Sequence, residues 1–96
     1  MYVQAEFTII LCTGRREDNR SDTVQWLNNF NIDFDHLFMR STNDRRPDYI
    51  VKHEIYKTFI EPNYLPVVAV YEDRTQVVEM WRDLGLTCLQ VQKGDY

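Results

Sequence analysis

Residues 67–71 have the sequence Val-Val-Ala-Val-Tyr, and Glu72 and Asp73 follow directly. A short, continuous apolar run rich in β-branched residues is typical of a strand covered on both faces, as in a parallel sheet. Residues 7–12 form a second such run, which stops at Thr13 and Gly14. The two runs therefore predict an α/β fold with a mostly parallel sheet.

Two further strands are expected at residues 36–39 and 87–92, and a helix is expected in each of the three intervals between strands. The helices are indicated by apolar residues at helical spacing and by candidate terminal residues, namely Ser21, Pro47, Pro62, Thr75 and Gly85. Crossovers of this length predict one four-stranded Rossmann-like sheet with helices on both faces. Trp26 and Trp81 lie on the apolar side of their helices, so both are expected in the core.

The composition is that of one small globular domain over residues 1–96. The chain has 11 basic and 15 acidic residues, and a net charge of −4 argues against a general nucleic-acid binder. Six of those 11 basic residues fall within residues 15–46, which indicates either a local basic patch or a solubilising face. Cys12 and Cys88 are expected to be buried thiols in a reducing cytoplasm, and no apolar run is long enough for a membrane span.

Polar residues follow each predicted strand, at the edge where parallel sheets bind ligands. Thr13 and Gly14 offer a hydroxyl and accessible backbone N–H groups to phosphoryl oxygens, although a plain turn would have the same sequence. Glu72 and Asp73 are hard oxygen ligands suited to Mg²⁺, or else acids at a helix N-terminus. Lys52 can supply a positive charge, or it is a solvated helix residue. His36 and His53 have no evident catalytic partner.

These residues resemble motifs of the haloacid dehalogenase (HAD) superfamily. The similarity is closest to the 3′-phosphatase domain of bacteriophage polynucleotide kinase/phosphatase. The most specific stretch is residues 72–82, Glu-Asp-Arg-Thr-Gln-Val-Val-Glu-Met-Trp-Arg, together with the Gly-Asp-Tyr sequence of residues 94–96. The resemblance runs from residue 1 to residue 96, and it implies a Mg²⁺-dependent phosphatase that acts on nucleic-acid 3′-phosphate ends in the cytoplasm, or in the host cytoplasm if the protein is viral.

The resemblance also implies a role for each matching residue. Thr13 and Lys52 would act in catalysis, Thr13 by binding a phosphoryl oxygen and Lys52 by neutralising the phosphoryl group and the nucleophile. Glu72 and Asp73 would hold the metal ion, with Asp73 the safer assignment because Glu72 stands where the phage domain has Asp. The residues that would engage phosphate or nucleic acid are Gly14, Arg15 and Arg40.

One family motif has no counterpart in the expected place. The family's nucleophile and its general acid/base form an Asp-x-Asp pair at the end of an opening strand, and no such strand precedes residues 7–12. The resemblance places that strand centrally, between the strands at residues 7–12 and 67–71. We therefore expect a truncated domain in which the gap closes directly, is filled by strand exchange in a homodimer, or is filled by a separate polypeptide, with the homodimer preferred.

Two functions follow from this departure. The chain is either a phosphatase module that is inactive alone and needs a complementing segment, or a catalytically silent relic that still binds phosphate or nucleic-acid ends. A gene fragment that folds without any function is a third alternative.

Overall fold

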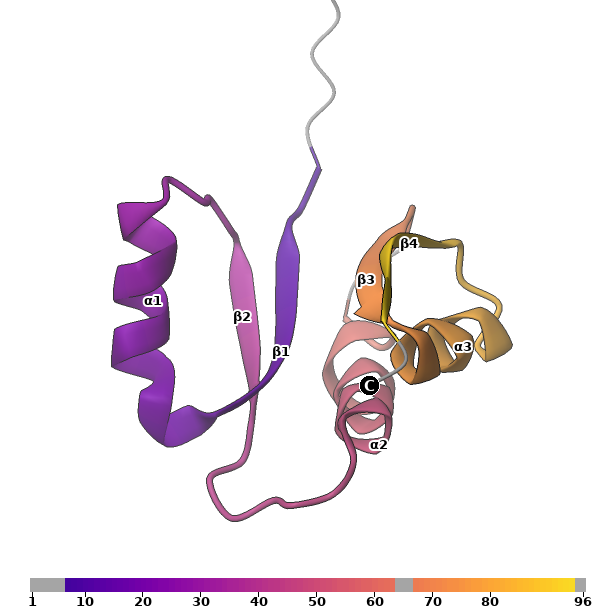
Figure 1. The fold of residues 1–96 in the computed structure, drawn as a ribbon, viewed down its shortest axis with the longest axis horizontal. Helices are drawn as coiled ribbons and strands as arrows, with labels where there is room; N and C mark the ends of the chain where they lie inside the picture. Colours follow the sequence, from indigo (N-terminus) through magenta and orange to yellow (C-terminus); the bar gives the residue numbers. More distant parts are fainter. Residues whose placement is uncertain (1–6, 64–66, 95–96) are drawn as a thin grey trace, which may run out of the picture. The chain divides into compact units, whose positions relative to one another are not determined.

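The computed structural model describes residues 7–63 and 67–94. These residues divide into two compact units, one up to Asp44 and one from Arg45 onward. Each unit contains a two-stranded parallel sheet with helical segments (Figure 1). In chain order, the strands and longer helices are β1 (Ile10–Arg16), α1 (Arg20–Asn29), β2 (His36–Arg40), α2 (Asp48–Ile55), β3 (Val70–Arg74), α3 (Thr75–Asp83) and β4 (Cys88–Gly94), with a short 3-10 turn at Glu17–Asn19 and a π-helical extension of α2 at Tyr56–Ile60.

The first unit is a β1–α1–β2 crossover. β1 and β2 pair in parallel, with Ile10 opposite His36, and α1 lies beside the sheet (Figure 1). Leu27 of α1 packs with Leu37 and Met39 of β2 to form the buried core of this unit. Antiparallel neighbours could have been joined by a tight turn, but parallel neighbours need a crossover such as α1.

Arg20 fixes the start of α1 to the sheet. Its guanidinium donates to the carboxylate of Glu17 and to the backbone oxygen of Leu37, 3.0 Å away. The same bond to Arg20 lowers the pKa of Glu17 below its ordinary value. A charged side chain thus connects the two ends of the crossover.

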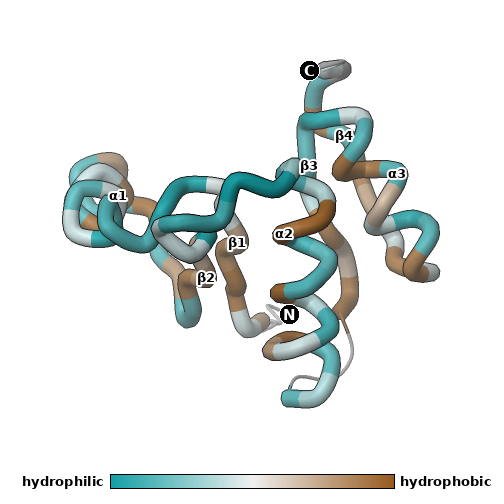
Figure 2. Tube along the Cα trace, turned by 90° about the horizontal axis from the view of Figure 1, so that it is seen from below, coloured by the Kyte–Doolittle hydropathy of each residue, from teal (hydrophilic) through white to brown (hydrophobic). Residues whose placement is uncertain are grey.

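The second unit repeats this plan with a larger core. β3 and β4 pair in parallel, with Val70 opposite Cys88, and α3 packs on the sheet while α2 packs on α3. Apolar residues recur along both helices (Figure 2). The most deeply buried residues are Val77 and Val78, each 1% exposed, and the ring of Trp81 meets that of Tyr56 edge to face at 5.9 Å.

All four predicted strands are present, but the observed strands extend further toward the C-terminus than the apolar runs. Residues 13–16 and 72–74 were expected to follow strands, and they belong to β1 and β3. The reason is that backbone pairing with the neighbouring strand, rather than side-chain hydropathy, determines where a strand ends. Because the described strands form two two-stranded sheets, each of β1 and β3 is paired on one side only among the described strands.

Two predicted N-caps are wrong. α1 begins at Arg20 rather than after Ser21, and Thr75 is the first residue of α3, whose N-cap position is occupied by Arg74. The predicted stop of α3 at Gly85 is confirmed, because Gly85 has φ +83° and follows the last turn. The helical segment over residues 48–60 buries Val51, Ile55 and Ile60, whereas Phe59 is exposed.

Burial corrects two further expectations. Trp81 is in the core, but Trp26 is 50% exposed and contacts the exposed ring of Phe30, with the centroids 4.8 Å apart and the ring planes tilted by 41°. Cys88 is buried and Cys12 is half-buried, and neither forms a disulfide. Burial raises the pKa of the Cys88 thiol. No helix among the described residues is long and apolar enough to span a membrane.

Candidate functional site

Lys52 is at the centre of a buried charged network in the second unit. Its Nζ lies 2.9 Å from Glu72 Oε1 and 3.3 Å from Asp48 Oδ2. A guanidinium nitrogen of Arg74 lies 3.2 Å from the same oxygen of Asp48. The side chains of Lys52, Asp48 and Glu72 are only 9–10% exposed, so these ion pairs are largely shielded from solvent. The interpretation of Lys52 as a solvated helix residue is therefore wrong.

The four side chains of this network lie on one face of α2 and one face of β3. Asp48 and Lys52 are four residues apart on α2, so both side chains lie on one face of the helix. Glu72 and Arg74 are two residues apart on β3, so both lie on one face of the sheet. Because α2 turns its charged face toward the end of β3, two acids and two bases balance one another.

The end of β3 is further fixed by hydrogen bonds to the backbone. Glu72 Oε2 accepts the N–H of Asp73 at 3.1 Å, so this carboxylate bonds Lys52 with one oxygen and its own strand with the other. The side chain of Gln90 on β4 donates to the backbone oxygen of Asp73 at 2.9 Å and to Thr75 Oγ1 at 3.1 Å. Glu72 therefore orients Lys52, and the backbone on either side of Asp73 is held in place.

A second polar arrangement is present in the first unit, at the carboxyl end of β1. Thr13 lies opposite Met39 and Arg16 lies opposite Arg40, so Gly14 and Arg15 bulge out of the β1–β2 ladder. A β-bulge at a strand end re-aims side chains and exposes backbone groups. Thr13 Oγ1 accepts the N–H of Arg15 at 3.2 Å, which further shapes this turn.

Arg40 supports the bulge from β2. Its Nε donates to the backbone oxygen of Gly14 at 2.8 Å, and its NH1 donates to that of Asp44 at 3.1 Å. The side chain of Arg15, in contrast, is exposed and makes no ion pair or hydrogen bond with other described residues. Arg15 is thus available to an anion, while Arg40 holds the loop on which Thr13 and Arg15 lie.

The residues that were predicted to bind a metal do not form a complete site by themselves. Both oxygens of Glu72 are occupied, one by Lys52 and one by backbone N–H groups. Within residues 7–63 and 67–94, no group of three or more His, Cys, Asp or Glu side chains is placed to hold a metal ion. A Mg²⁺ ion near Asp73 would need oxygen ligands from outside this part of the chain.

The chain contains one Asp-x-Asp sequence, Asp33-Phe34-Asp35, which was not among the predicted site residues. It precedes β2 rather than following a strand, and Asp35 Oδ2 accepts the N–H of Ile9 at 2.7 Å. Ile9 lies just before β1, so this carboxylate is at the opposite end of the sheet from Thr13. These two acids cannot serve as the nucleophile pair for a site at the carboxyl ends of the strands.

The structure thus brings the predicted site residues together in two groups, each within its own unit. Thr13, Gly14, Arg15 and Arg40 surround the β1 bulge, and Lys52 contacts Glu72 at the end of β3. Asp48 and Arg74 also belong to this network and were not among the predicted site residues. The four-residue spacing of Asp48 and Lys52 was a usable signal, because such helical pairs commonly form ion pairs.

Comparison with known proteins identifies the family. Residues 1–96 match the family model of the polynucleotide kinase PNKP phosphatase domain. A putative bifunctional polynucleotide kinase/RNA ligase of Autographa californica nuclear polyhedrosis virus is 36% identical over 79 residues, which cover 81% of this chain and 11% of that protein.

Two solved structures are also similar. Chains from "Structure of the Pnkp1/Rnl/Hen1 RNA repair complex" and "Structure of Pnkp1/Rnl/Hen1 complex" match 93% of this chain at 42% identity, with TM-scores of 0.88 and 0.87. This chain covers 29% and 31% of those chains, so it spans less than a third of each and about a tenth of the viral relative. The chain belongs to the HAD-like family of polynucleotide kinase PNKP phosphatase domains.

Proposed function

We propose that residues 1–96 belong to a single HAD-like domain that forms part of a Mg²⁺-dependent polynucleotide 3′-phosphatase. The observation that carries the proposal is the buried ion pair between Lys52 and Glu72, 2.9 Å long, in a chain that matches the phosphatase-domain family over its whole length. An ammonium group oriented by a carboxylate, at the carboxyl end of a parallel strand, is suited to stabilising the charge of a transferring phosphoryl group.

The remaining roles follow the chemistry of each side chain. Thr13 and the backbone of Gly14 bind phosphoryl oxygens, and Arg15 binds the phosphate with its planar guanidinium. Arg40 keeps the Thr13–Arg15 bulge in shape through its bonds to backbone oxygens.

We further propose that the carboxylate nucleophile comes from outside residues 1–96. The support is the position of Asp33 and Asp35, which lie at the wrong end of the strands. β1 and β3 are each paired on one side among the described strands, so each has an edge that can accept a further strand. A strand that ends in Asp-x-Asp, from the rest of a longer polypeptide or from another chain, would supply the nucleophile and pair with such an edge. Strand exchange in a homodimer would pair with such an edge without supplying these acids.

Mg²⁺ enters the proposal through Asp73, with the added carboxylates as its other ligands. When bound, the ion would offset the negative charge of the phosphate and of the acids around it. Glu72 is better suited to holding Lys52 than to binding the metal directly, because both of its oxygens already accept hydrogen bonds.

The proposal is tested by complementation. The 96-residue chain is mixed, or fused through a flexible linker, with a strand-forming segment that ends in Asp-x-Asp-Gly, and phosphate release from a 3′-phosphorylated oligonucleotide is measured with and without Mg²⁺. We expect release only with the Asp segment and Mg²⁺, and none with the matched Asn-x-Asn segment or with the chain alone. Equal release with the Asn segment would refute an external nucleophile, and no release in any combination would refute the phosphatase assignment.

Binding without catalysis is the second candidate function, and the exposed guanidinium of Arg15 favours it. In that case a 3′-phosphorylated oligonucleotide would bind the chain alone at low salt more tightly than its 3′-hydroxyl counterpart. Salt and the substitution Arg15→Ala should both weaken the complex. An affinity that neither of them changes would exclude this function.

A further inference from the structure

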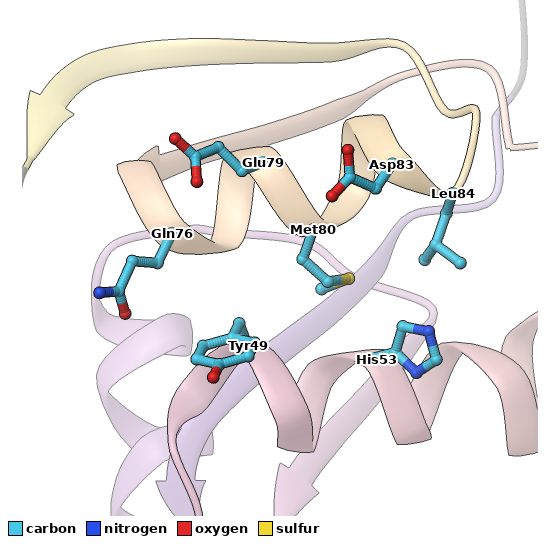
Figure 3. A pocket seen from close by; sticks show the side chains of 7 residues that line it. All are labelled: Tyr49, His53, Gln76, Glu79, Met80, Asp83 and Leu84. Atoms are coloured by element: carbon cyan, nitrogen blue, oxygen red, sulfur yellow. The ribbon is translucent and has the colours of Figure 1, made fainter.

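The second unit has an open groove between α2 and α3 that the proposed catalytic residues do not line. Its volume is about 510 Å³. Tyr49 and His53 point into the groove from α2, Gln76 and Met80 line it from α3, and Leu84 lines it from the position just after α3 (Figure 3). We call this the α2–α3 groove.

The lining of the groove has the periodicity of a helix-binding surface. Tyr49 and His53 are four residues apart, as are Gln76, Met80 and Leu84, so each helix contributes a row of side chains along its own axis. The α3 row extends over about 12 Å, or roughly two helical turns. Apolar Met80 and Leu84 alternate there with polar neighbours, which is the pattern that an amphipathic helix fits.

The charge of the groove selects the occupant. Glu79 and Asp83 also line it, both are exposed, and neither has an ion-pair partner among the described residues. Arg82, which lies between them in sequence, donates instead to the backbone oxygen of Cys88 at 3.0 Å. The α3 side of the groove therefore has two negative charges, one helical turn apart, that no described residue neutralises.

The position of Asp83 adds to this argument. Asp83 is the last residue of α3, where the helix dipole disfavours a negative charge. A residue that costs stability without a compensating contact is expected where it has a binding role.

From these observations we infer that the α2–α3 groove binds an amphipathic helix of a partner protein. The bound face of that helix would have two basic residues four positions apart, opposite Glu79 and Asp83, and apolar residues that contact Met80 and Leu84. This inference does not depend on the proposed phosphatase activity, because it uses none of the same residues.

The test uses the full 96-residue chain and a fluorescent, alanine-rich helical peptide of about 14 residues, with Lys at positions i and i+4 and Leu on the same face. Affinity is measured by fluorescence anisotropy, and the binding site is mapped by amide chemical-shift changes. A second peptide replaces Lys with Glu, and a third keeps Lys and replaces Leu with Gln.

Charge-matched variants distinguish groove binding from general attraction to an acidic chain. We expect the Lys/Leu peptide to bind, with shifts confined to α2 and α3, and Glu79→Lys/Asp83→Lys to weaken it about tenfold or more. Asp22→Lys/Asp33→Lys changes the net charge equally at exposed positions of the first unit and should leave the affinity unchanged. Circular dichroism of both variants verifies that they are folded.

Four results would overturn the inference. They are no binding of the Lys/Leu peptide, equal weakening by both pairs of charge reversals, undiminished binding of the Leu-to-Gln peptide, and chemical shifts outside the groove. Concentration-dependent self-association that Glu79→Lys/Asp83→Lys abolishes would assign the groove to a second copy of the chain and would also overturn it.

Discussion

A double-mutant cycle on the buried pair of Lys52 and Glu72 tests the structural basis of the candidate site. Lys52→Met removes the pairs of 2.9 and 3.3 Å and leaves two acids that are each only 10% exposed. Breaking a buried pair by removing one partner typically costs about 3–5 kcal/mol. Because Arg74 still pairs with Asp48, we expect a value near the lower end, about 3 kcal/mol.

The other corners of the cycle follow the same reasoning. Glu72→Gln leaves Lys52 paired with Asp48 and should cost less, about 2 kcal/mol. In the double variant no ammonium and no Glu72 carboxylate remain, so the two costs should not add, and the coupling energy should be about 1–3 kcal/mol. The free energy of unfolding is measured by urea titration. A fixed concentration of stabilising osmolyte is present throughout, so that all four chains are folded at zero urea.

A Trp26→Phe background lets fluorescence report on Trp81 and hence on the second unit. The matched control is Lys57→Met. Lys57 pairs with Glu61 at 3.1 Å, with the same four-residue spacing as Asp48 and Lys52, but the side chains of Lys57 and Glu61 are 46% and 49% exposed. An exposed pair contributes only about 0–1 kcal/mol. Equal costs for Lys52→Met and Lys57→Met, or a coupling energy near zero, would refute the argument that Lys52 is held in a buried network.

Three further outcomes are expected. Arg40→Lys should lower the free energy of unfolding by about 1–2 kcal/mol in urea titrations. The reason is that an ammonium group cannot reproduce the two hydrogen bonds of the guanidinium to the backbone oxygens of Gly14 and Asp44. An unfolding free energy equal to that of the wild type would contradict this. Gly85→Ala should cost about 1 kcal/mol in thermal unfolding because of its φ of +83° alone, since no atom lies within 4 Å of an added Cβ, whereas Gly85→Asn should cost less. Burial raises the pKa of Cys88, so the unfolded state loses the thiol proton at a lower pH than the folded state. The free energy of unfolding should therefore fall as the pH rises through the ordinary thiol pKa. A Cys88→Ala variant should show a smaller fall over the same pH range.

The order of elements could be predicted because strands and helices leave different apolar periodicities in the sequence. The run at residues 67–71 located β3, and the helical spacing before Gly85 located α3. The ends of the strands were harder to place. The polar residues Thr13 and Arg16 of β1, and Glu72 and Arg74 of β3, pair with neighbouring strands, and such pairing leaves no local signal in the sequence.

Burial of individual residues was predictable only where one helical face is clearly apolar. Trp26 lies among apolar residues of α1, but the side of that helix that faces the sheet is defined by Thr23 and Leu27. Lys52, in contrast, is buried although a lysine on a helix is usually exposed, because its charge is compensated by Glu72, twenty residues later in the chain. Such a long-range ion pair cannot be predicted from the sequence without knowing the fold.

We propose that Lys52 serves phosphoryl transfer in a polynucleotide 3′-phosphatase. The most direct measurement is the initial rate of phosphate release from a 3′-phosphorylated oligonucleotide by the complemented chain, compared between Lys52→Met and Lys57→Met. Both variants are first shown to be folded. We expect phosphate release to be lost with Lys52→Met and to keep its original rate with Lys57→Met. Undiminished release by a folded Lys52→Met chain would contradict it.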